Sequence, residues 1–395
     1  LARAVARVRV TSRWLNAVSV DATAQQIVAV RALPFVSAVV PVGRGSSDDR
    51  PSPPTPRAWG PEPWPLELTA IDKLHARGLT GKGVRIGVID SGFELGHVAF
   101  AGLEVAAARD FIQGDDEVAD EPGDAPGQAE HGTQTLGVLA GRVAGEYEGA
   151  APMATYFLAK TEHVDDLVAD EDRYVAGLEW LEAQGVDLIS TSVGFFYEYT
   201  PDKFDGESTA ASKATRVAVD HGVHVVAAAG NAGPSRHTVG APADVDGVLA
   251  VGAVDKSGML ASFSSRGPTA DGRIKPDVVA PGVFVWTVAP GTLDEYAPVG
   301  GTSIAAPLAA GAAALVLESA HGLPINPLDR LRLTADNAGA PNSAIGWGLI
   351  DAAAAAGPAE IADKGGCSVV PDPPRPLAFM LSVLLLIRRR RSNAG

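Results

Sequence analysis

Cysteine, basic charge and long apolar runs are all scarce in this chain of 395 residues. The single cysteine, Cys367, excludes an intrachain disulfide, but a chain of this length can bury a core that needs none. Residues 59–358 carry 18 Lys and Arg against 41 Asp and Glu, and so acidic a segment argues against nucleic-acid binding. Residues 1–57 are basic instead, with 8 basic and 3 acidic residues. Their opposite charge favours docking on the acidic body.

Apolar runs of membrane-spanning length are missing at both ends. No run typical of a signal peptide precedes the Arg-rich start Leu1–Arg13, so we expect that the sequence lacks its true beginning. Near the C-terminus, Leu377–Ile387 has 11 residues, fewer than the roughly 20 that span a bilayer. The arginines Arg388–Arg391 that follow would stay on the cytoplasmic side of a membrane and leave the upstream domain outside.

The composition divides the chain into four parts: residues 1–42, 43–65, 66–358 and 359–395. The first part has the pattern of a strand from Trp14 to Val20, a helix over Ala24–Leu33 and a second strand over Phe35–Val42. The second part is dense in Pro, Ser and Gly, which indicates a linker where the chain is easily cleaved. With 46% hydrophobic residues, the chain has enough apolar surface for one large core.

In residues 66–358, continuous Val, Ile and Leu runs alternate with helical patterns. The runs are Val84–Ile89, Tyr156–Ala159, Val186–Ser190, Val223–Ala229 and Val248–Val254. The expected helices are Ala70–Arg77, Thr133–Arg142, Asp172–Gln184, Thr209–His221 and Leu308–Ala320. We therefore predict an α/β fold with a mostly parallel central sheet and helices on both faces. In such sheets, functional residues gather beyond the carboxyl ends of the strands.

Three polar residues are expected near that edge. Asp90 ends a predicted strand, His131 heads a helix in the motif His-Gly-Thr-Gln, and Asn231 follows a run that ends in Gly230. Each has an ordinary structural alternative: an N-cap aspartate, a capping or core histidine, and a turn asparagine. None of them, taken singly, establishes a catalytic site.

Ser303 lies in the stretch Gly-Gly-Thr-Ser-Ile-Ala-Ala-Pro, residues 300–307, before the Ala-rich helix. The glycines allow close approach of a ligand, and the helix N-terminus offers free N–H groups that stabilise an oxyanion. Pro307 is tolerated because it comes early in the helix. The alternative is that Ser303 is simply a small residue that lets the helix pack closely.

Together these residues meet the requirements of nucleophilic catalysis by serine. A serine hydroxyl attacks when an imidazole takes its proton, a carboxylate holds that imidazole in the right tautomer, and amide donors receive the oxyanion. Ser303, His131 and Asp90 supply the first three groups. Asn231 supplies a side-chain amide. The chain order Asp, His, Ser differs from the orders of chymotrypsin and of the α/β-hydrolases.

The segment from about Thr69 to Ala356 resembles the subtilisin-like serine proteases. The likeness rests on Asp90-Ser91-Gly92, His131-Gly132-Thr133, Ala229-Gly230-Asn231, Ala261-Ser262-Phe263-Ser264-Ser265-Arg266-Gly267-Pro268, Lys275-Pro276-Asp277 and Gly301-Thr302-Ser303. The resemblance implies a triad of Asp90, His131 and Ser303. It also implies an oxyanion hole made by Asn231 and the Ser303 N–H. Residues 1–42 resemble the inhibitor-type propeptide of these proteases, which assists folding and then fills the cleft until the linker is cut.

The same resemblance places the substrate. Ser192, Val193 and Gly194 are expected to pair with an extended substrate by strand addition. The walls of the main specificity pocket are expected to be Ala227, Ala228, Ala229, Gly230, Thr238, Val239 and Gly240. No acid stands among them, so we predict a large apolar residue just before the scissile bond. The segment Glu162–Asp172 would rim the opposite side, either attracting upstream cationic residues or forming a solvated loop.

Two positions depart from the family pattern. Gln134 stands where many relatives have a second histidine, outside the triad. Ala99 replaces an Asp that helps bind calcium in subtilisin, so a structural calcium ion is possible but not supported at the usual position. No cofactor is expected to be required. A solvated loop is favoured over an ion site for the acidic residues Asp115, Asp116, Asp120 and Asp124.

In the tail, Cys367, a short apolar stretch and an Arg block resemble the C-terminal sorting tails of myxobacterial surface proteins. Such tails are thought to be cut near the Cys. The resemblance implies an extracytoplasmic enzyme, secreted or anchored at the cell surface, that contacts the membrane only through its tail. A plain tail anchor is the alternative.

These expectations describe a serine endopeptidase that cleaves polypeptides through an acyl-enzyme on Ser303, with its own propeptide as inhibitor. Two other classes are considered. A catalytically silent binding protein would keep the same fold. Nucleotide binding is suggested by Gly81-Lys82-Gly83, but these glycines precede the strand, which is the wrong side for a phosphate loop.

Overall fold

The computed structural model describes residue 5 and residues 7–43, 61–164, 170–196, 199–320 and 324–358. Asp165, Asp166, Tyr197 and the whole tail with Cys367 lie outside the described residues.

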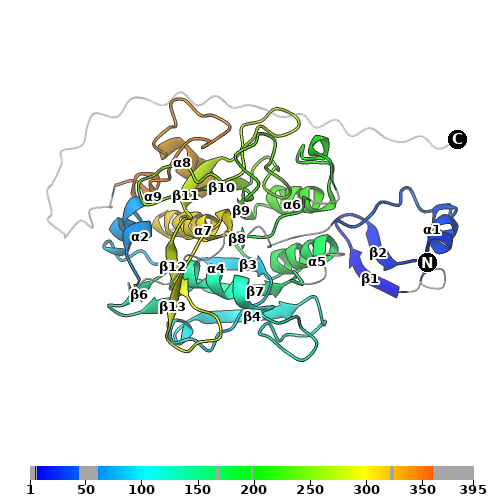
Figure 1. Cartoon of the computed structure of the whole chain (residues 1–395), viewed down its shortest axis with the longest axis horizontal. Coiled ribbons are helices and arrows are strands. Elements are labelled where there is room, and N and C mark those ends of the chain that lie inside the picture. Colours follow the sequence, from blue (N-terminus) through cyan, green and yellow to red (C-terminus); the bar gives the residue numbers. More distant parts are fainter. Residues whose placement is uncertain are drawn as a thin grey trace, which may run out of the picture. The chain divides into compact units, whose positions relative to one another are not determined.

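A sheet of seven parallel strands, counted over the described residues, forms the centre of residues 66–358 (Figure 1). Its order is β11-β10-β9-β8-β3-β7-β4. The strands are β3 (Arg85–Asp90), β4 (Glu104–Asp110), β7 (Thr155–Lys160), β8 (Leu188–Thr191), β9 (His224–Ala228), β10 (Leu249–Val254) and β11 (Val278–Pro281). Strand residues such as Ile86, Ile189 and Val225 are fully buried, because both faces of the sheet are covered. The predicted α/β fold is confirmed.

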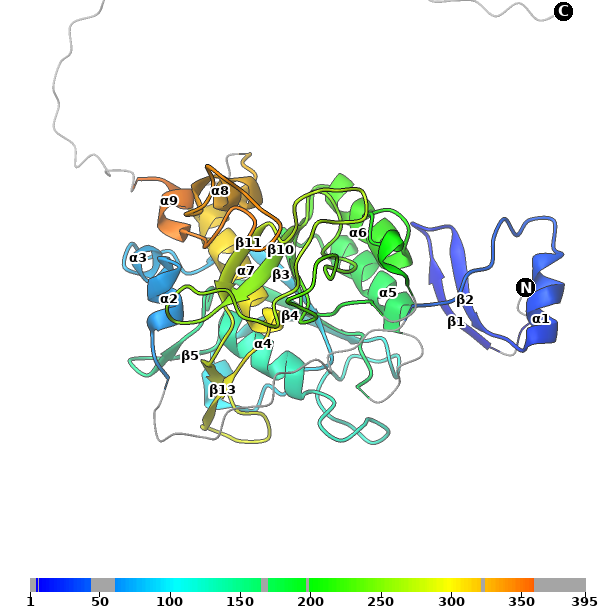
Figure 2. The same cartoon turned by 45° about the horizontal axis from the view of Figure 1, so that its top comes forward.

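Helices cover both faces (Figure 2). On one face α7 (Thr302–Ser319) packs against β8 to β11 and against α4 (Glu130–Ala140). On the other face α5 (Asp170–Ala183) and α6 (Ala210–Asp220) pack against each other and against the strands. Among the described helices α7 is long and apolar enough to cross a membrane, yet 78% of its apolar window is buried inside the protein. It is therefore the core helix of this fold, and its Ala-rich sequence allows the close packing.

Shorter elements complete the domain. They are α2 (Trp64–Leu68), α3 (Ile71–His75), η1 (Val98–Phe100), β5 (Arg142–Val143), β6 (Tyr147–Glu148), η2 (Pro201–Lys203), β12 (Val285–Val288), β13 (Tyr296–Val299), α8 (Pro327–Thr334) and α9 (Ala352–Ala356). The sequence did not predict strands β4 and β11. The first lies at the edge of the sheet and is only partly buried, and the second has four residues, so neither shows a long apolar run.

The N-terminal part departs from the prediction. An antiparallel pair, β1 (Arg7–Ser12) and β2 (Ala17–Asp21), precedes helix α1 (Ala24–Arg31). The second strand predicted over Phe35–Val42 is absent there, and Phe35 and Val40 are 71% and 73% exposed. The prediction was wrong because β-rich composition does not supply a pairing partner: β2 pairs with β1, which the sequence pattern had not indicated.

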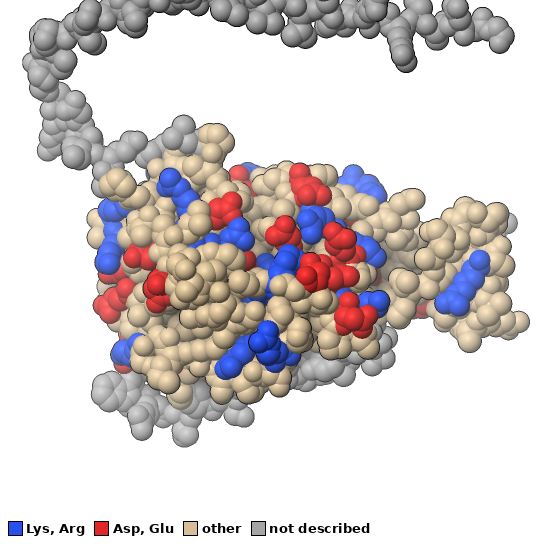
Figure 3. Space-filling model, turned by 90° about the horizontal axis from the view of Figure 1, so that it is seen from above, with Lys and Arg blue, Asp and Glu red and all other residues tan. Residues whose placement is uncertain are grey.

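Charged side chains of both signs are interspersed on the surface shown in Figure 3. Several form exposed ion pairs, such as Lys256 with Glu62 at 2.6 Å and Arg109 with Asp116 at 3.0 Å. Exposed pairs of this kind contribute only about 0–1 kcal/mol to stability. The charges with larger energetic consequences lie inside, at the carboxyl edge of the sheet.

That edge aligns three charged residues. Asp90 at the end of β3 lies opposite Lys160 at the end of β7, and Lys160 lies opposite Asp110 at the end of β4. Strand β3 lies between β7 and β8, and the strand order runs away from it in both directions. Asp90 therefore stands at the switch point of the sheet, where parallel α/β folds place their functional residues.

Candidate active site

Asp90 is held by three donors in the interior. It is 1% exposed, and its Oδ1 accepts hydrogen bonds from the Ser91 N–H at 2.8 Å and from His131 Nδ1 at 2.7 Å. Its Oδ2 accepts from the Thr135 hydroxyl at 3.0 Å. Burial alone raises the pKa of Asp90, but the charge and hydrogen bond of His131 and the other donors outweigh it, so the pKa lies below its usual value. Asp90 is therefore an ionised acceptor.

His131 is the second residue of α4, and its ring lies against Asp90. Because a carboxylate only accepts, the ring nitrogen that faces it, Nδ1, carries the proton. In the neutral ring Nε2 is then the proton acceptor. The arrangement fixes the tautomer that a general base requires.

Ser303 is the second residue of α7, and the helix begins directly after Gly301. The φ of Gly301 is 141°, in a region that residues with a side chain rarely adopt. Helices α4 and α7 pack against each other, and each carries its polar residue at its N-terminal end. Pro307 cannot supply the N–H that would normally bond the carbonyl of Ser303 four residues earlier. That carbonyl accepts instead from the Ser192 hydroxyl at 2.8 Å. The proline thus leaves the Ser303 carbonyl available for the hydrogen bond that holds the Ser192 segment.

Asn231 is oriented by the residue before the serine. Its Oδ1 accepts from the Thr302 N–H at 2.9 Å and from the Thr302 hydroxyl at 3.0 Å. Since the N–H can only donate, the amide atom that faces Thr302 must be Oδ1, and Nδ2 is the other atom of the amide. Among the described residues Nδ2 has no protein acceptor, so it remains a donor for a ligand.

The predicted substrate-binding residues take two positions. The side chains of Val193, Ala227 and Ala229 are buried in the apolar core on the α5 and α6 side, so they support the walls from behind. Ala228 is 8% exposed and belongs to the core on the α7 side. Gly194, Gly230 and Gly240 come together around one ring, that of Phe196. The sequence left open whether the aromatic residues Phe195, Phe196, Tyr197 and Tyr199 shape the exit of the cleft or serve core or loop packing.

The sequence-based prediction for Glu162 was wrong. It was expected on a rim, but its side chain is 1% exposed and its carboxylate lies within 4.8 Å of ligand atoms of both Asp90 and His131. Its backbone carbonyl accepts from Gln128 Nε2 at 2.5 Å, and the same amide nitrogen lies 2.5 Å from the carbonyl of Ser91. Glu162 therefore places a second carboxyl group beside the imidazole. No motif signals this, because it depends on how the end of β7 packs against that of β3.

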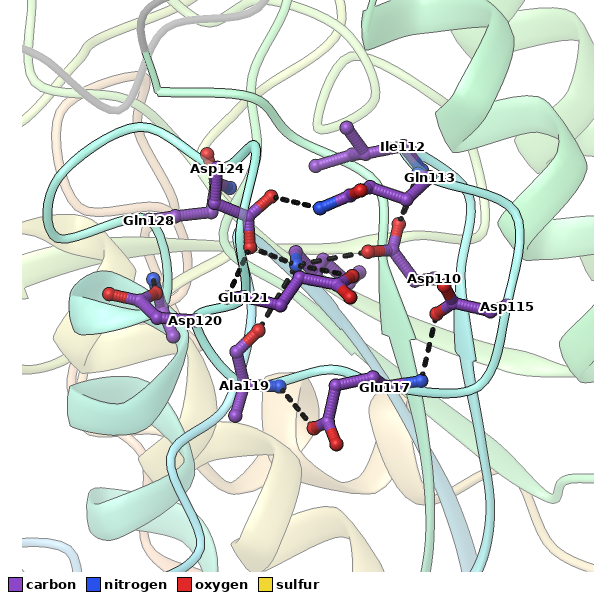
Figure 4. Close-up of polar contacts among 12 residues, drawn as sticks. Asp110, Ile112, Gln113, Asp115, Glu117, Ala119, Asp120, Glu121, Asp124 and Gln128 are labelled. Atoms are coloured by element: carbon purple, nitrogen blue, oxygen red, sulfur yellow. Dashed lines mark hydrogen bonds and ion pairs between the residues drawn. The ribbon is translucent and has the colours of Figure 1, made fainter.

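The acidic loop after β4 encloses a protein cation (Figure 4). Lys160 Nζ lies 2.9 Å from Asp110 Oδ2 and 2.6 Å from Asp124 Oδ2, and it donates to the carbonyl of Ala119 at 3.2 Å. Burial lowers the pKa of Lys160, but the two carboxylates outweigh it and the pKa is raised. The prediction of a solvated loop was wrong for Asp124, whose side chain is 2% exposed, and holds for Asp116, which is 80% exposed.

Lys160 also opposes the binding of a metal ion in this loop. Asp110, Asp115 and Glu121 have carboxylate oxygens close enough to share an ion, but Lys160 Nζ already lies 2.9 Å from Asp110 and 3.9 Å from Glu121. An ion would have to compete with this ammonium group. At the other position considered from the sequence, Ala99 is buried and its methyl group offers no oxygen.

Strand β1 of the N-terminal part lies beside α5 (Figure 1). Two acidic residues on one face of α5 bind the N-terminal part. Glu179 Oε1 accepts from the Ser12 hydroxyl at 2.5 Å and from the Trp14 N–H at 3.3 Å. Two turns away, Asp172 forms an ion pair with Arg9 at 3.0 Å. Glu179 and Asp172 are seven residues apart and therefore face the same side of the helix.

Comparison with known proteins agrees with this geometry. The family model described as "Subtilase family" matches residues 81–348, more than half of the chain, and the one described as "Peptidase S8 propeptide domain, Bacteroidota" matches residues 1–52. The chain is 35% identical to subtilisin DY of Bacillus licheniformis over 74% of its own length and 98% of the relative's. It is 33% identical to subtilisin BL of Lederbergia lenta with the same coverage. Against subtilisin E of Bacillus subtilis (strain 168), the identity is 35% over 74% of the chain and 71% of the relative. The chain therefore belongs to the subtilase family and is a subtilisin-like serine endopeptidase with a propeptide domain.

Proposed function

We propose that this endopeptidase works through an acyl-enzyme on Ser303. His131 Nε2 takes the proton of the Ser303 hydroxyl as the hydroxyl attacks the scissile carbonyl, and then gives it to the leaving amine. Asp90 holds the ring and stabilises the imidazolium. Water then attacks the acyl group, with His131 again acting as the base.

Two donors support the oxyanion in this proposal. Thr302 occupies Asn231 Oδ1, so Nδ2 is available as a donor, and a carbon attached to Gly301 would lie 3.6 Å from this Nδ2 and 2.8 Å from Ser303 Oγ. The Ser303 N–H belongs to the first turn of the helix, where backbone donors have no intrahelical partner. In enzymes of this kind one such donor contributes about 10²–10³-fold to kcat.

The observation that carries the proposal is the 2.7 Å bond between His131 Nδ1 and Asp90, because it fixes the tautomer that can act as a base. The test is labelling by a fluorophosphonate probe together with hydrolysis of a denatured protein substrate. Ser303→Ala should abolish both. Ser319→Ala, at the other end of the same helix, should change neither. Labelling that survives in Ser303→Ala would refute the assignment.

We also infer that the N-terminal part is an intramolecular inhibitor held by α5. The supporting observations are the bonds of Ser12 and Trp14 to Glu179 and the ion pair of Arg9 with Asp172. A hydrogen bond to a charged group contributes about 1.5–3 kcal/mol. The isolated propeptide, added to mature Glu179→Ala enzyme, should therefore inhibit at least tenfold more weakly. Asp116→Ala, which removes an exposed acid that pairs with Arg109, is the control.

For the substrate, the absence of a charged side chain among the predicted wall residues supports an apolar residue before the scissile bond. We propose that the enzyme requires no cofactor and holds no calcium ion at the usual position, where Ala99 offers no oxygen ligand. We propose further that it is exported and held at the cell surface by its tail. Fractionation of Cys367→Ala tests this, since a simple tail anchor would not depend on the thiol.

A further inference from the structure

The ring of Phe196 fills a space between three glycines from three separate segments. A carbon attached to Gly240 would lie 2.2 Å from Cε1 of this ring. One attached to Gly194 would lie 2.5 Å from Cε2, and one attached to Gly230 would lie 2.7 Å from Cζ. The three contacts involve three different atoms of one ring. The ring therefore lies between the three backbones and leaves little room on any of these sides.

This space lies next to the proposed nucleophile. The segment before Gly194 is bonded to α7 through the Ser192 hydroxyl and the carbonyl of Ser303 at 2.8 Å. The opposite segment is bonded to the same helix end through the Gly230 N–H and the Thr302 hydroxyl at 3.0 Å. Both walls are thus fixed against the first two residues of α7. A substrate bound with its scissile carbonyl at Ser303 would direct the preceding side chain between them.

The direction of Phe196 follows from its neighbour. The Phe195 N–H donates to the carbonyl of Ala241 at 2.9 Å in an antiparallel bridge, which makes this stretch locally extended. Phe195 is fully buried and meets Tyr174 edge to face, with ring centres 5.3 Å apart. Since successive side chains of an extended chain point to opposite sides, Phe196 points to the side opposite Phe195, toward the glycines, and packs on the edge of the same core. The ring of Phe204 packs edge to face with that of Phe196, and the two ring centres lie 6.0 Å apart.

We propose that Phe196 is a specificity-determining residue that fills the main specificity pocket and limits it to small side chains. This inference rests on the proposed role of Ser303. The enzyme cleaves best after residues such as Ala or Gly, because a Leu or Phe side chain has to displace a ring that contacts three backbones and Phe204. The large apolar preference predicted from the sequence then belongs to the pocket with the ring removed.

The test compares quenched peptides that are identical except for Gly, Ala, Leu or Phe before the scissile bond. The mature wild-type enzyme should show a kcat/KM for Ala at least about tenfold above that for Phe, since one or two methylene groups already discriminate about 10–200-fold. In Phe196→Ala the order should reverse, with kcat/KM for the Phe peptide rising at least about 30-fold and that for the Ala peptide changing less than about threefold. Phe196→Leu should fall between the two.

Controls separate this inference from the proposed function. The fraction of enzyme labelled by the fluorophosphonate probe normalises every rate and shows that each variant is folded. Phe284→Ala removes an exposed ring elsewhere, 56% exposed, and should leave the peptide order unchanged. Equal cleavage after Ala and Phe by the wild-type enzyme, with the same ratio in labelled Phe196→Ala and Phe196→Leu, would overturn the role of Phe196 alone. A wild-type enzyme that is not labelled at Ser303 would overturn the proposed function instead.

Discussion

Asp90 and Asp110 end two strands that flank β7, and both are almost fully buried. They differ in the basic group that faces them. Asp90 meets His131 at 2.7 Å, and Asp110 meets Lys160 at 2.9 Å. An imidazole exchanges its proton near neutral pH, whereas a lysine whose pKa is raised keeps its charge. The same edge of one sheet thus holds one buried carboxylate beside an imidazole and another beside an ammonium group, and we expect the first to serve catalysis and the second stability.

The comparison also shows why both pairs need further donors. Asp90 is bonded by the Ser91 N–H and the Thr135 hydroxyl, and Asp110 Oδ1 accepts from the Ile112 and Gln113 N–H groups at 2.5 and 3.0 Å. A buried charge pair offsets its desolvation only when the remaining lone pairs are also satisfied. Removing one partner from such a pair costs much more than the intact pair contributes.

The largest expected effect is on catalysis, at the histidine pair. Asp90→Asn should lower kcat by about 10⁴-fold, because an amide no longer selects the required tautomer of His131. The midpoint of thermal unfolding should change little by comparison. Kinetics and calorimetry on the same preparation measure both. Asp116→Asn, in an exposed pair, is the control, and a loss of less than tenfold in Asp90→Asn would contradict the role given to Asp90.

At the lysine pair the effect should be on stability. Lys160→Met leaves Asp110 and Asp124 buried without their cation and should lower the free energy of unfolding by about 3–5 kcal/mol. The kcat of the folded fraction, normalised by active-site labelling, should remain close to wild type. Urea unfolding measures the difference, with the exposed Lys256→Met as a control expected to cost about 0–1 kcal/mol. Equal stability of the two variants would show that the Lys160 cluster is not structural.

A smaller effect is expected from the hydroxyl that supports Asp90. Thr135→Val removes a hydrogen bond of 3.0 Å to a charged acceptor and should lower kcat/KM about tenfold. Thr133→Val is a matched change in the same helix, since Thr133 bonds the carbonyl of Ala129 and does not touch Asp90. If both variants lose activity in proportion to their stability, Thr135 acts only through folding.

The smallest expected effect is on how stability changes as the pH falls. Burial raises the pKa of Asp124, but Lys160 and other donors lower it below its ordinary value of 3.8. The stability it contributes is therefore present above that value and is lost as the pH falls through the lower folded pKa. In Lys160→Met, Lys160 no longer opposes the effect of burial on the pKa of Asp124, so Asp124 is protonated at a higher pH. The deficit of this variant relative to wild type should shrink by about 1 kcal/mol between pH 7 and 4, as measured by urea unfolding. A constant deficit would contradict the assigned pairing.

The sequence allowed prediction of those features whose signal is local. Continuous apolar runs predicted five of the seven strands described in the central sheet, and the His131 and Ser303 motifs marked two helix N-termini. Composition did not predict the strands correctly where the pairing with another strand determines the structure. Phe35–Val42 has the residues of a strand but no partner, while Arg7–Ser12, in which Arg and Val alternate, pairs with β2 although it was not predicted as a strand. Propensity is a weak guide when the partner strand is not known.

The sequence by itself determined the fold class, the family and the four polar residues that belong to its motifs, because each depends on residues near one another or on a repeated pattern. Only the tertiary structure decided that the Phe196 ring lies between Gly194, Gly230 and Gly240, that Glu162 lies beside the imidazole and that Lys160 serves as the cation of the acidic loop. These three facts depend on segments far apart along the chain. Their side chains meet because the strands align in register and the helices fix the loops between them.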